Sequence, residues 1–182
     1  MKSVLISIRP AWCKLIADGR KTIEVRKTHP KLDTPFKCFI YCTDGSTLYR
    51  SYYDHEIRFY RSKLDSHFAH HTVLNRKIIG EFVCDKLVWV ISHPSIFAGR
   101  ALLHQKAIDD AALTIDEAEA YSNGKDLFGW HIADLVIYDQ PKPLDEFSKY
   151  GFGRDVPLRR PPLSWCYIDA KDVDHVKEGD IL

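Results

Sequence analysis

The stretch Gly19-Arg20-Lys21-Thr22-Ile23-Glu24-Val25-Arg26 joins a predicted helix to a predicted strand. Gly19 favours the end of the helix, because glycine adopts the left-handed conformation of a helix terminus at little cost. Apolar and polar residues alternate after Lys21, which predicts a short strand. Ile23 and Val25 would face the core from this strand. The stretch therefore predicts a helix–turn–strand unit near the start of the chain.

The polar residues of this unit could form a site. Thr22, Glu24 and Arg26 share the strand face opposite to the core residues. Lys21 has the parity of the core residues, so it can join the other three only from the turn. A lysine beside a carboxylate and an arginine can transfer a proton or hold an anion. The same spacing also fits an exposed strand edge with a weak salt bridge, and spacing alone leaves both interpretations open.

The rest of the chain predicts mainly strands. A buried strand at residues 4–8 precedes a helix that begins at Pro10, where the missing amide hydrogen costs nothing. The capping box from Thr114 to Glu117 predicts a single further helix towards Ser122. Further strands are expected at residues 36–42, 78–91, 128–132, 135–138 and 165–168.

Three residue types refine these strands. Gly80 favours a bulge or a close backbone approach, and Pro141 and Pro143 are expected to end the strand before them. Trp89 is expected in the core. The order of elements does not alternate as in a doubly wound sheet. We therefore expect an α+β, mainly β protein, a small mixed or antiparallel barrel with helices at its ends.

Composition limits the function more than it defines it. The 182 residues suit one domain, 1–182, and 45% hydrophobic with 28% charged residues is typical of a globular protein. Because 26 basic residues face 25 acidic ones, a nucleic-acid site would need local clusters of charge. Five cysteines are an odd number for a disulfide scaffold and lack the CxxC spacing of a zinc site, so Cys38 and Cys42 are expected as buried thiols and no metal site is expected. No signal peptide or membrane span is expected, which favours the cytoplasm.

Residues 45–77 interrupt the strand pattern, and we interpret them as an insertion in the domain. Aromatic residues alternate there with arginines and lysines, as in proteins that hold single-stranded nucleic acid by stacking and phosphate attraction. The alternative is a loop whose tyrosines pack back on the barrel. The candidate RNA contacts of this segment are Arg50, Tyr52, Tyr53, Arg58, Tyr60 and Arg61.

The pattern G-x-K-T-x-E-x-R of residues 19–26 resembles the signature of the ASCH domain family, named for its homology to activating signal cointegrator. Other segments are similar to a bacterial and prophage-borne subset of that family. They are Ser7-Ile8-Arg9-Pro10-Ala11-Trp12, Ile79-Gly80-Glu81-Phe82, Phe128-Gly129-Trp130-His131-Ile132 and Arg160-Pro161-Pro162-Leu163-Ser164-Trp165-Cys166-Tyr167. The resemblance covers most of the chain except residues 45–77.

The resemblance implies a PUA-like pseudo-barrel of mixed strands with flanking helices, in a superfamily that binds RNA or modified bases in a cleft. Lys21, Glu24 and Arg26 would line this cleft, and Gly19 would form the turn. Trp12 or Trp165 would stack on a base. Arg9 and Thr22 complete the expected binding set.

The resemblance also implies alternatives in activity. Some similar bacterial proteins are amidohydrolases of an acetylated cytidine, with a G-x-K-T-x-T-x-R motif whose second threonine is the nucleophile. Glu24 replaces that threonine here, so Lys21 and Glu24 could only be an acid/base pair acting through water. A ribonuclease is a further alternative, and only this one would use a divalent metal; otherwise no cofactor is expected. The last alternative is a protein-interaction module without a nucleic-acid ligand.

Overall fold

The computed structural model describes residues 2–53, 56–60, 71–93, 101–151 and 156–169. Two sheets contain the strands. The larger has the order β10-β11-β1-β3-β7-β9-β2, with β8 paired to β7, and the smaller has the order β5-β4-β6. The larger sheet consists of β1 (Lys2–Ile8), β2 (Ile23–Arg26), β3 (Phe36–Cys42), β7 (Lys77–Ser92), β8 (Leu102–Leu103), β9 (Leu127–Lys142), β10 (Ser148–Lys149) and β11 (Trp165–Asp169). The smaller consists of β4 (Tyr49–Tyr53), β5 (Glu56–Tyr60) and β6 (His71–Val73).

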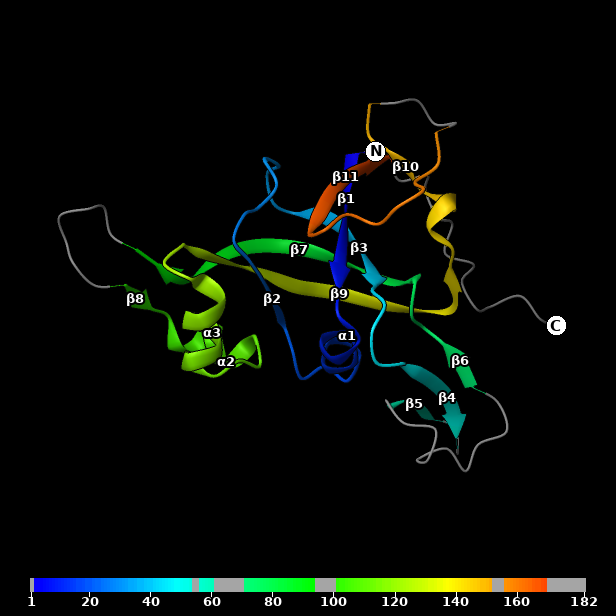
Figure 1. The fold of residues 1–182 in the computed structure, drawn as a ribbon, viewed down its shortest axis with the longest axis horizontal. Coiled ribbons are helices and arrows are strands. Elements are labelled where there is room, and N and C mark those ends of the chain that lie inside the picture. Colours follow the sequence, from blue (N-terminus) through cyan, green and yellow to red (C-terminus); the bar gives the residue numbers. More distant parts are fainter. Residues whose placement is uncertain (1, 54–55, 61–70, 94–100, 152–155, 170–182) are drawn as a thin grey trace.

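The helices are short and lie around the larger sheet. They are α1 (Pro10–Ala17), α2 (Gln105–Asp110), α3 (Ile115–Ser122) and the 3-10 turn η2 (Leu144–Glu146). The long strands β7 and β9 run side by side through the molecule, with α2 and α3 towards one end and the smaller sheet towards the other (Figure 1). None of the helices in the described ranges has the length and apolar character to cross a membrane.

The larger sheet is mixed and is not closed into a barrel. β1 and β3 are parallel. The chain passes through α1 and β2 between them, so β3 starts at the same end of the sheet as β1. All other pairings in this sheet are antiparallel. This architecture confirms the expected mainly β pseudo-barrel of mixed strands with flanking helices.

The turn after α1 has the geometry expected from Gly19. Its φ of 70° lies in the left-handed region. The amide of Gly19 donates to the carbonyl of Ile16 at 2.9 Å, and the amide of Arg20 donates to the carbonyl of Leu15 at 2.8 Å. These two bonds form a Schellman motif, which satisfies the last carbonyls of the helix. The chain therefore leaves α1 in a tight turn and enters β2 after the five residues 18–22.

Both faces of the central strands are buried. Cys38, Ile40 and Cys42 point to one face of β3 and lie in the main core with Trp130. Phe39, on the opposite face, packs with the ring of Phe147. The expected buried thiols are confirmed, since four of the five cysteines are buried and Cys166 is partly buried.

The structure corrects the predictions for two strands, for the number of helices and for Trp89. Residues 128–132 and 135–138 belong to one strand, β9, which continues through Pro141 to Lys142. Asp134 has a φ of 47°, and the pairing of β7 with β9 shifts there, so a bulge bends the strand without ending it. The further helix predicted from the capping box is α3, but α2 precedes it and is not predicted, because six residues are too short for a periodic pattern. Trp89 is 45% exposed and packs its ring on Phe128, outside the core.

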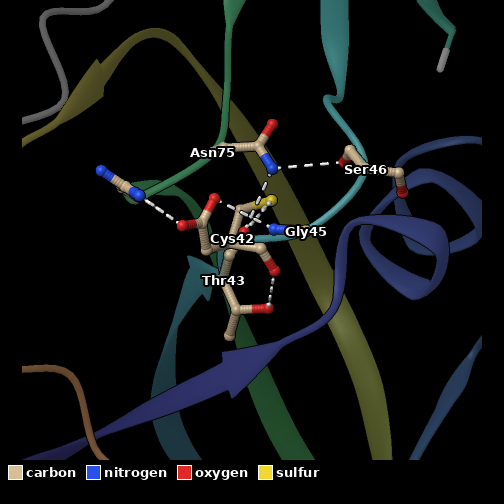
Figure 2. A network of polar contacts seen from close by, with 7 residues as sticks. Cys42, Thr43, Gly45, Ser46 and Asn75 are labelled. Carbon is tan, nitrogen blue, oxygen red and sulfur yellow. Dashed lines mark hydrogen bonds and ion pairs between the residues drawn. The ribbon is translucent and has the colours of Figure 1, made fainter. Parts of the chain in front are cut away.

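Residues 45–77 contribute the smaller sheet. Tyr49 and Tyr60 stack on one another at 5.8 Å and are buried, as in the alternative in which tyrosines pack inwards. The side chain of Asn75 holds the start of this segment (Figure 2). Its amide donates to the carbonyls of Thr43 and Ser46, and its oxygen accepts from the amide of Leu48 at 2.7 Å. One side chain therefore bonds three residues on the path from β3 into β4.

Candidate functional site

A cavity of about 460 Å³ opens between β1, β2, α1 and α3. It lies where β2, the last strand in the order of the larger sheet, passes β1 without joining its ladder. A side chain connects the two strands, because Arg26 Nη2 donates to the carbonyl of Ser7 at 2.6 Å. Lys21, Glu24 and Arg26 all line this cavity.

Lys21 reaches the cavity from the turn, as its parity requires. It precedes β2 and is only 4% exposed. Its Nζ donates to the carbonyl of Ala111 at 2.8 Å, at the end of α2, and lies 5.0 Å from the ring centre of Trp12. The carbonyl end of a helix and an aromatic face both stabilise a cation. This is how the fold accommodates a buried lysine.

Glu24 lies between two cations. Its Oε1 is 2.9 Å from Arg26 Nη2, and its Oε2 is 3.6 Å from Lys21 Nζ. The carboxylate is 4% exposed, so these charges compensate much of its burial. Burial is the largest influence on Lys21 and lowers the pKa of its ammonium, with Arg26 acting in the same direction and Glu24 against it. The trio therefore contains a lysine that releases its proton more readily than a free one.

Two buried atoms of this trio have no hydrogen-bond partner in the described part of the chain. They are Glu24 Oε2, an acceptor, and Arg26 Nε, a donor. The 3.6 Å between Lys21 Nζ and Glu24 Oε2 is an ion-pair distance and too long for a hydrogen bond. Buried polar atoms are almost always paired in folded proteins. Their position in side chains that line a cavity makes them candidate ligand contacts.

The other predicted binding residues divide into two groups. Arg9 and Trp12 line the cavity from the start of α1. Thr22 is exposed and bonds the carbonyl of Asp110 through its amide at 2.9 Å, so it fixes the turn to α2 without lining the cavity. Trp165 packs on Trp130 and Tyr167 and donates to Thr28 Oγ1 at 3.1 Å, and it is not a lining residue.

The sequence did not indicate the opposite wall of the cavity. Leu113, Glu117 and Tyr121 belong to α3 or directly precede it, and all three line the cavity. They lie about a hundred residues from the motif in the chain, so only the tertiary structure brings them together. Their spacing of four residues, at and just before a capped helix, places them on one helical face, but it does not indicate which element that face meets.

Thr43 and Leu163 complete the rim on the other side. Thr43 belongs to the loop that is bonded to Asn75 (Figure 2). The Asn75 side chain therefore also helps to position this part of the cavity wall. Leu163 is fully exposed, and the carbonyl of its neighbour Pro162 accepts from Ser7 Oγ at 2.7 Å. The rim thus has an exposed apolar side chain on a loop that is hydrogen-bonded to β1.

Arg50, Arg58 and Tyr60 are the expected RNA contacts whose side chains the structure describes, and none of the three lines this cavity. Arg50 is bound to β9, where it donates to the carbonyls of Tyr138 and Asp139 and pairs with the Asp139 carboxylate. Tyr60 is buried, whereas Arg58 is exposed on β5. Arg61 lies outside the described residues, and Tyr52 and Tyr53 are described only as backbone in β4.

The described residues include no group of three or more histidine, cysteine, aspartate or glutamate side chains that could hold a metal ion. Within the cavity lining, the carboxylates are Glu24 and Glu117. Glu117 is used in part by the capping box, since it accepts from the Thr114 amide at 2.8 Å.

Comparison with known proteins identifies the fold. ASCH from Zymomonas mobilis superposes with a TM-score of 0.51 at 16% identity, over 92% of this chain and 87% of that one. A tyrosine-to-phenylalanine mutant of the same protein superposes with a TM-score of 0.54 at 16% identity, over 93% and 91%. No protein-family model matches the chain, and no curated protein matches it. The chain therefore has the ASCH fold suggested by residues 19–26.

Proposed function

We propose that the cavity binds a base of RNA or of a modified nucleotide, with the edge of the base against Glu24 and Arg26. The supporting observation is the pair of buried, unpaired atoms Glu24 Oε2 and Arg26 Nε. An unpaired buried donor or acceptor costs about 1–3 kcal/mol, which a ligand with a matching acceptor and donor would recover. Base edges carry donors and acceptors side by side, and such a pair would match the acceptor Glu24 Oε2 and the donor Arg26 Nε.

Size and charge support the same proposal. The volume of about 460 Å³ falls in the usual range for small-molecule sites. Arg9, Lys21 and Arg26 among the lining residues outnumber Glu24 and Glu117, so the lining carries a net positive charge. This excess favours a ligand with anionic groups near the base. A nucleotide fits both the polar edge and the charge.

The binding proposal is tested with Glu24→Gln. The substitution keeps the size of the side chain but replaces an acceptor oxygen with an amide that donates. We expect affinity for the preferred base to fall at least about tenfold, as for loss of one charged hydrogen bond. Calorimetry with a panel of nucleosides, modified nucleosides and short RNAs would measure it.

Glu119→Gln is the matched control, because Glu119 lies on α3, is exposed and does not line the cavity. It should leave affinity unchanged. Binding that weakens with salt and leaves the RNA intact would support a binding protein. If the wild type binds none of these compounds, the proposal is wrong and the interaction-module alternative is favoured.

A second candidate function is hydrolysis at the same site. The observation in its favour is Lys21, whose pKa is lowered by burial and whose Nζ lies 3.6 Å from Glu24. Such a lysine can exchange a proton with a nearby water or leaving group more readily than an exposed one. The substrate would be an acylated cytidine or an RNA phosphodiester.

Mass spectrometry after incubation with acylated cytidine and short RNAs, with and without divalent metal, separates the two candidates. Turnover that disappears in Lys21→Met would favour the hydrolase. Compounds recovered unchanged after they have been shown to bind would favour the binding protein.

A further inference from the structure

Tyr121 is the exposed aromatic residue of the cavity wall. It lies in the last turn of α3, lines the cavity and is 40% exposed. Trp12, the other aromatic lining residue, is less exposed, because its ring packs against the main core. Trp165 does not line the cavity. Among the described lining residues, Tyr121 therefore offers the most open ring surface for a planar ligand.

Lys27 accompanies this ring. It follows Arg26 directly in the chain, and its Nζ lies 5.2 Å from the ring centre of Tyr121. In the described part of the chain no carboxylate pairs with Lys27, so none of the described acidic side chains neutralises its charge. A cation on a tyrosine at the mouth of a cavity is placed next to whatever group leaves the cavity there.

The polar side chains that would meet the base edge and the aromatic ring lie on opposite walls of the cavity. Glu24 and Arg26 come from β2, whereas Tyr121 comes from α3. A base that meets β2 with its hydrogen-bonding edge would need a contact for its flat face from another element. Stacking on an aromatic side chain is the common solution, and a positive charge beside it attracts the phosphate of the same nucleotide.

We propose that Tyr121 stacks on the bound base and that Lys27 pairs with the phosphate attached to it. The ligand is then a phosphorylated nucleoside or a nucleotide within a chain, and a free nucleoside binds more weakly. This inference rests on the proposed function, since it needs a base against Glu24 and Arg26. It adds two residues that the motif of residues 19–26 does not include.

The test compares ribonucleosides with their 5′- and 3′-monophosphates by calorimetry. Wild-type protein should bind one of the monophosphates about three- to fivefold more tightly than the nucleoside, as expected for one exposed ion pair. Lys27→Gln should remove this difference, so that the variant binds the monophosphate and the nucleoside with equal affinity. Tyr121→Ala should weaken both ligands by about five- to a hundredfold, the range for loss of one base stack, whereas Tyr121→Phe should bind as wild type.

A second lysine–tyrosine pair provides the matched control. Lys2 Nζ lies 4.9 Å from the ring centre of Tyr150, which is 44% exposed and does not line the cavity. Tyr150→Ala and Lys2→Gln should not change binding.

The outcomes separate the two proposals. If wild-type protein binds nucleosides or nucleotides and Tyr121→Ala binds them equally well, the inference is overturned and the proposed function stands. Equal loss in Tyr150→Ala would also overturn it. If wild-type protein binds neither class, both proposals fail together.

Discussion

Lys21 carries a positive charge that the fold has removed from water. Its compensation consists of the Ala111 carbonyl at 2.8 Å and Glu24 at 3.6 Å. We expect Lys21→Met to lower the free energy of unfolding by about 1–3 kcal/mol, because Glu24 loses one counter-charge and a helix-end carbonyl loses its donor. Urea denaturation would measure the change.

Lys106→Met is the control, since Lys106 forms a comparable pair with Asp110 but its side chain is 88% exposed. Loss of an exposed pair has little effect on stability. If both substitutions cost the same, Lys21 does not behave as a buried charge.

Lys21→Met also allows a test of how stability depends on pH. Burial lowers the pKa of Lys21 below its usual value of 10.5. Between the lowered pKa and 10.5, the unfolded chain binds a proton that the folded protein has released, so the unfolding free energy of the wild type rises with pH. The difference in stability between wild type and Lys21→Met should therefore grow as pH rises towards 10.5. A difference that stays constant or shrinks over this range would contradict the lowered pKa.

At the level of residues, the local geometry of the site could be predicted and its surroundings could not. Strand parity places Glu24 and Arg26 on one face, and the Gly19 turn brings Lys21 to them, because these relations depend on neighbours in the chain. Tyr121 is about a hundred residues away, and its place in the cavity depends on how α3 packs. Residue type predicts Trp89 in the core, but a tryptophan near the end of a long strand can project beyond the layer that covers it.

At the level of elements, Gly80 allows β7 and β9 to approach closely. A Cβ at this position would lie 2.3 Å from the carbonyl oxygen of Val136 and 3.1 Å from Ile137 Cα. Both are backbone atoms, so the strands would have to separate. We expect Gly80→Ala to cost about 2–4 kcal/mol of unfolding free energy, measured by urea denaturation.

Gly124→Ala separates this effect from backbone conformation. Gly124 has a φ of 73°, and a Cβ added there would meet no atom within 4 Å, so only the left-handed strain remains, at about 1 kcal/mol. If Gly80→Ala loses no more unfolding free energy than Gly124→Ala, β7 and β9 can move apart at little cost.

Asn75 bonds three residues on the path between β3 and β4. Its amide donates to the carbonyls of Thr43 and Ser46 (Figure 2), and its oxygen accepts from the amide of Leu48, a residue with no exposed surface. In Asn75→Ala that amide loses its partner, and we expect a loss of about 1–2 kcal/mol together with faster hydrogen exchange of the Leu48 amide. Asp44→Asn in the same loop affects an exposed ion pair with Arg76 and should change neither quantity noticeably. Unchanged exchange at Leu48 in Asn75→Ala would contradict this role.

The elements themselves were predictable where a pattern was long or a cap was specific. The Schellman glycine and the capping box at Thr114 mark α1 and α3, because both are local hydrogen-bond motifs. The sequence predicts two strands in place of β9 because residues 133 and 134 interrupt the alternation, and a bulge cannot be distinguished from a turn by sequence alone.

At the level of the whole molecule, Arg50 links the smaller sheet to the larger one. It lies on β4, its side chain is 10% exposed, and it donates to the β9 carbonyls of Tyr138 at 3.1 Å and Asp139 at 2.7 Å. Loops and small sheets that share few buried contacts with the main core can open separately from it. Arg50, one of the basic residues of 45–77, thus attaches the smaller sheet to β9.

This attachment predicts how the molecule opens. In Arg50→Met, amides of β4 and β6 should exchange faster by an order of magnitude or more, because two carbonyls and a carboxylate lose their donor. Amides of β1 and β3, inside the larger sheet, should keep their wild-type rates. Native-state hydrogen exchange by NMR measures both sets in one experiment. Arg76→Met is the matched control, because Arg76, between β6 and β7, pairs with Asp44, between β3 and β4, and its side chain is 71% exposed. If β4, β6, β1 and β3 accelerate together in Arg50→Met, the two sheets unfold as one unit and Arg50 contributes to global stability.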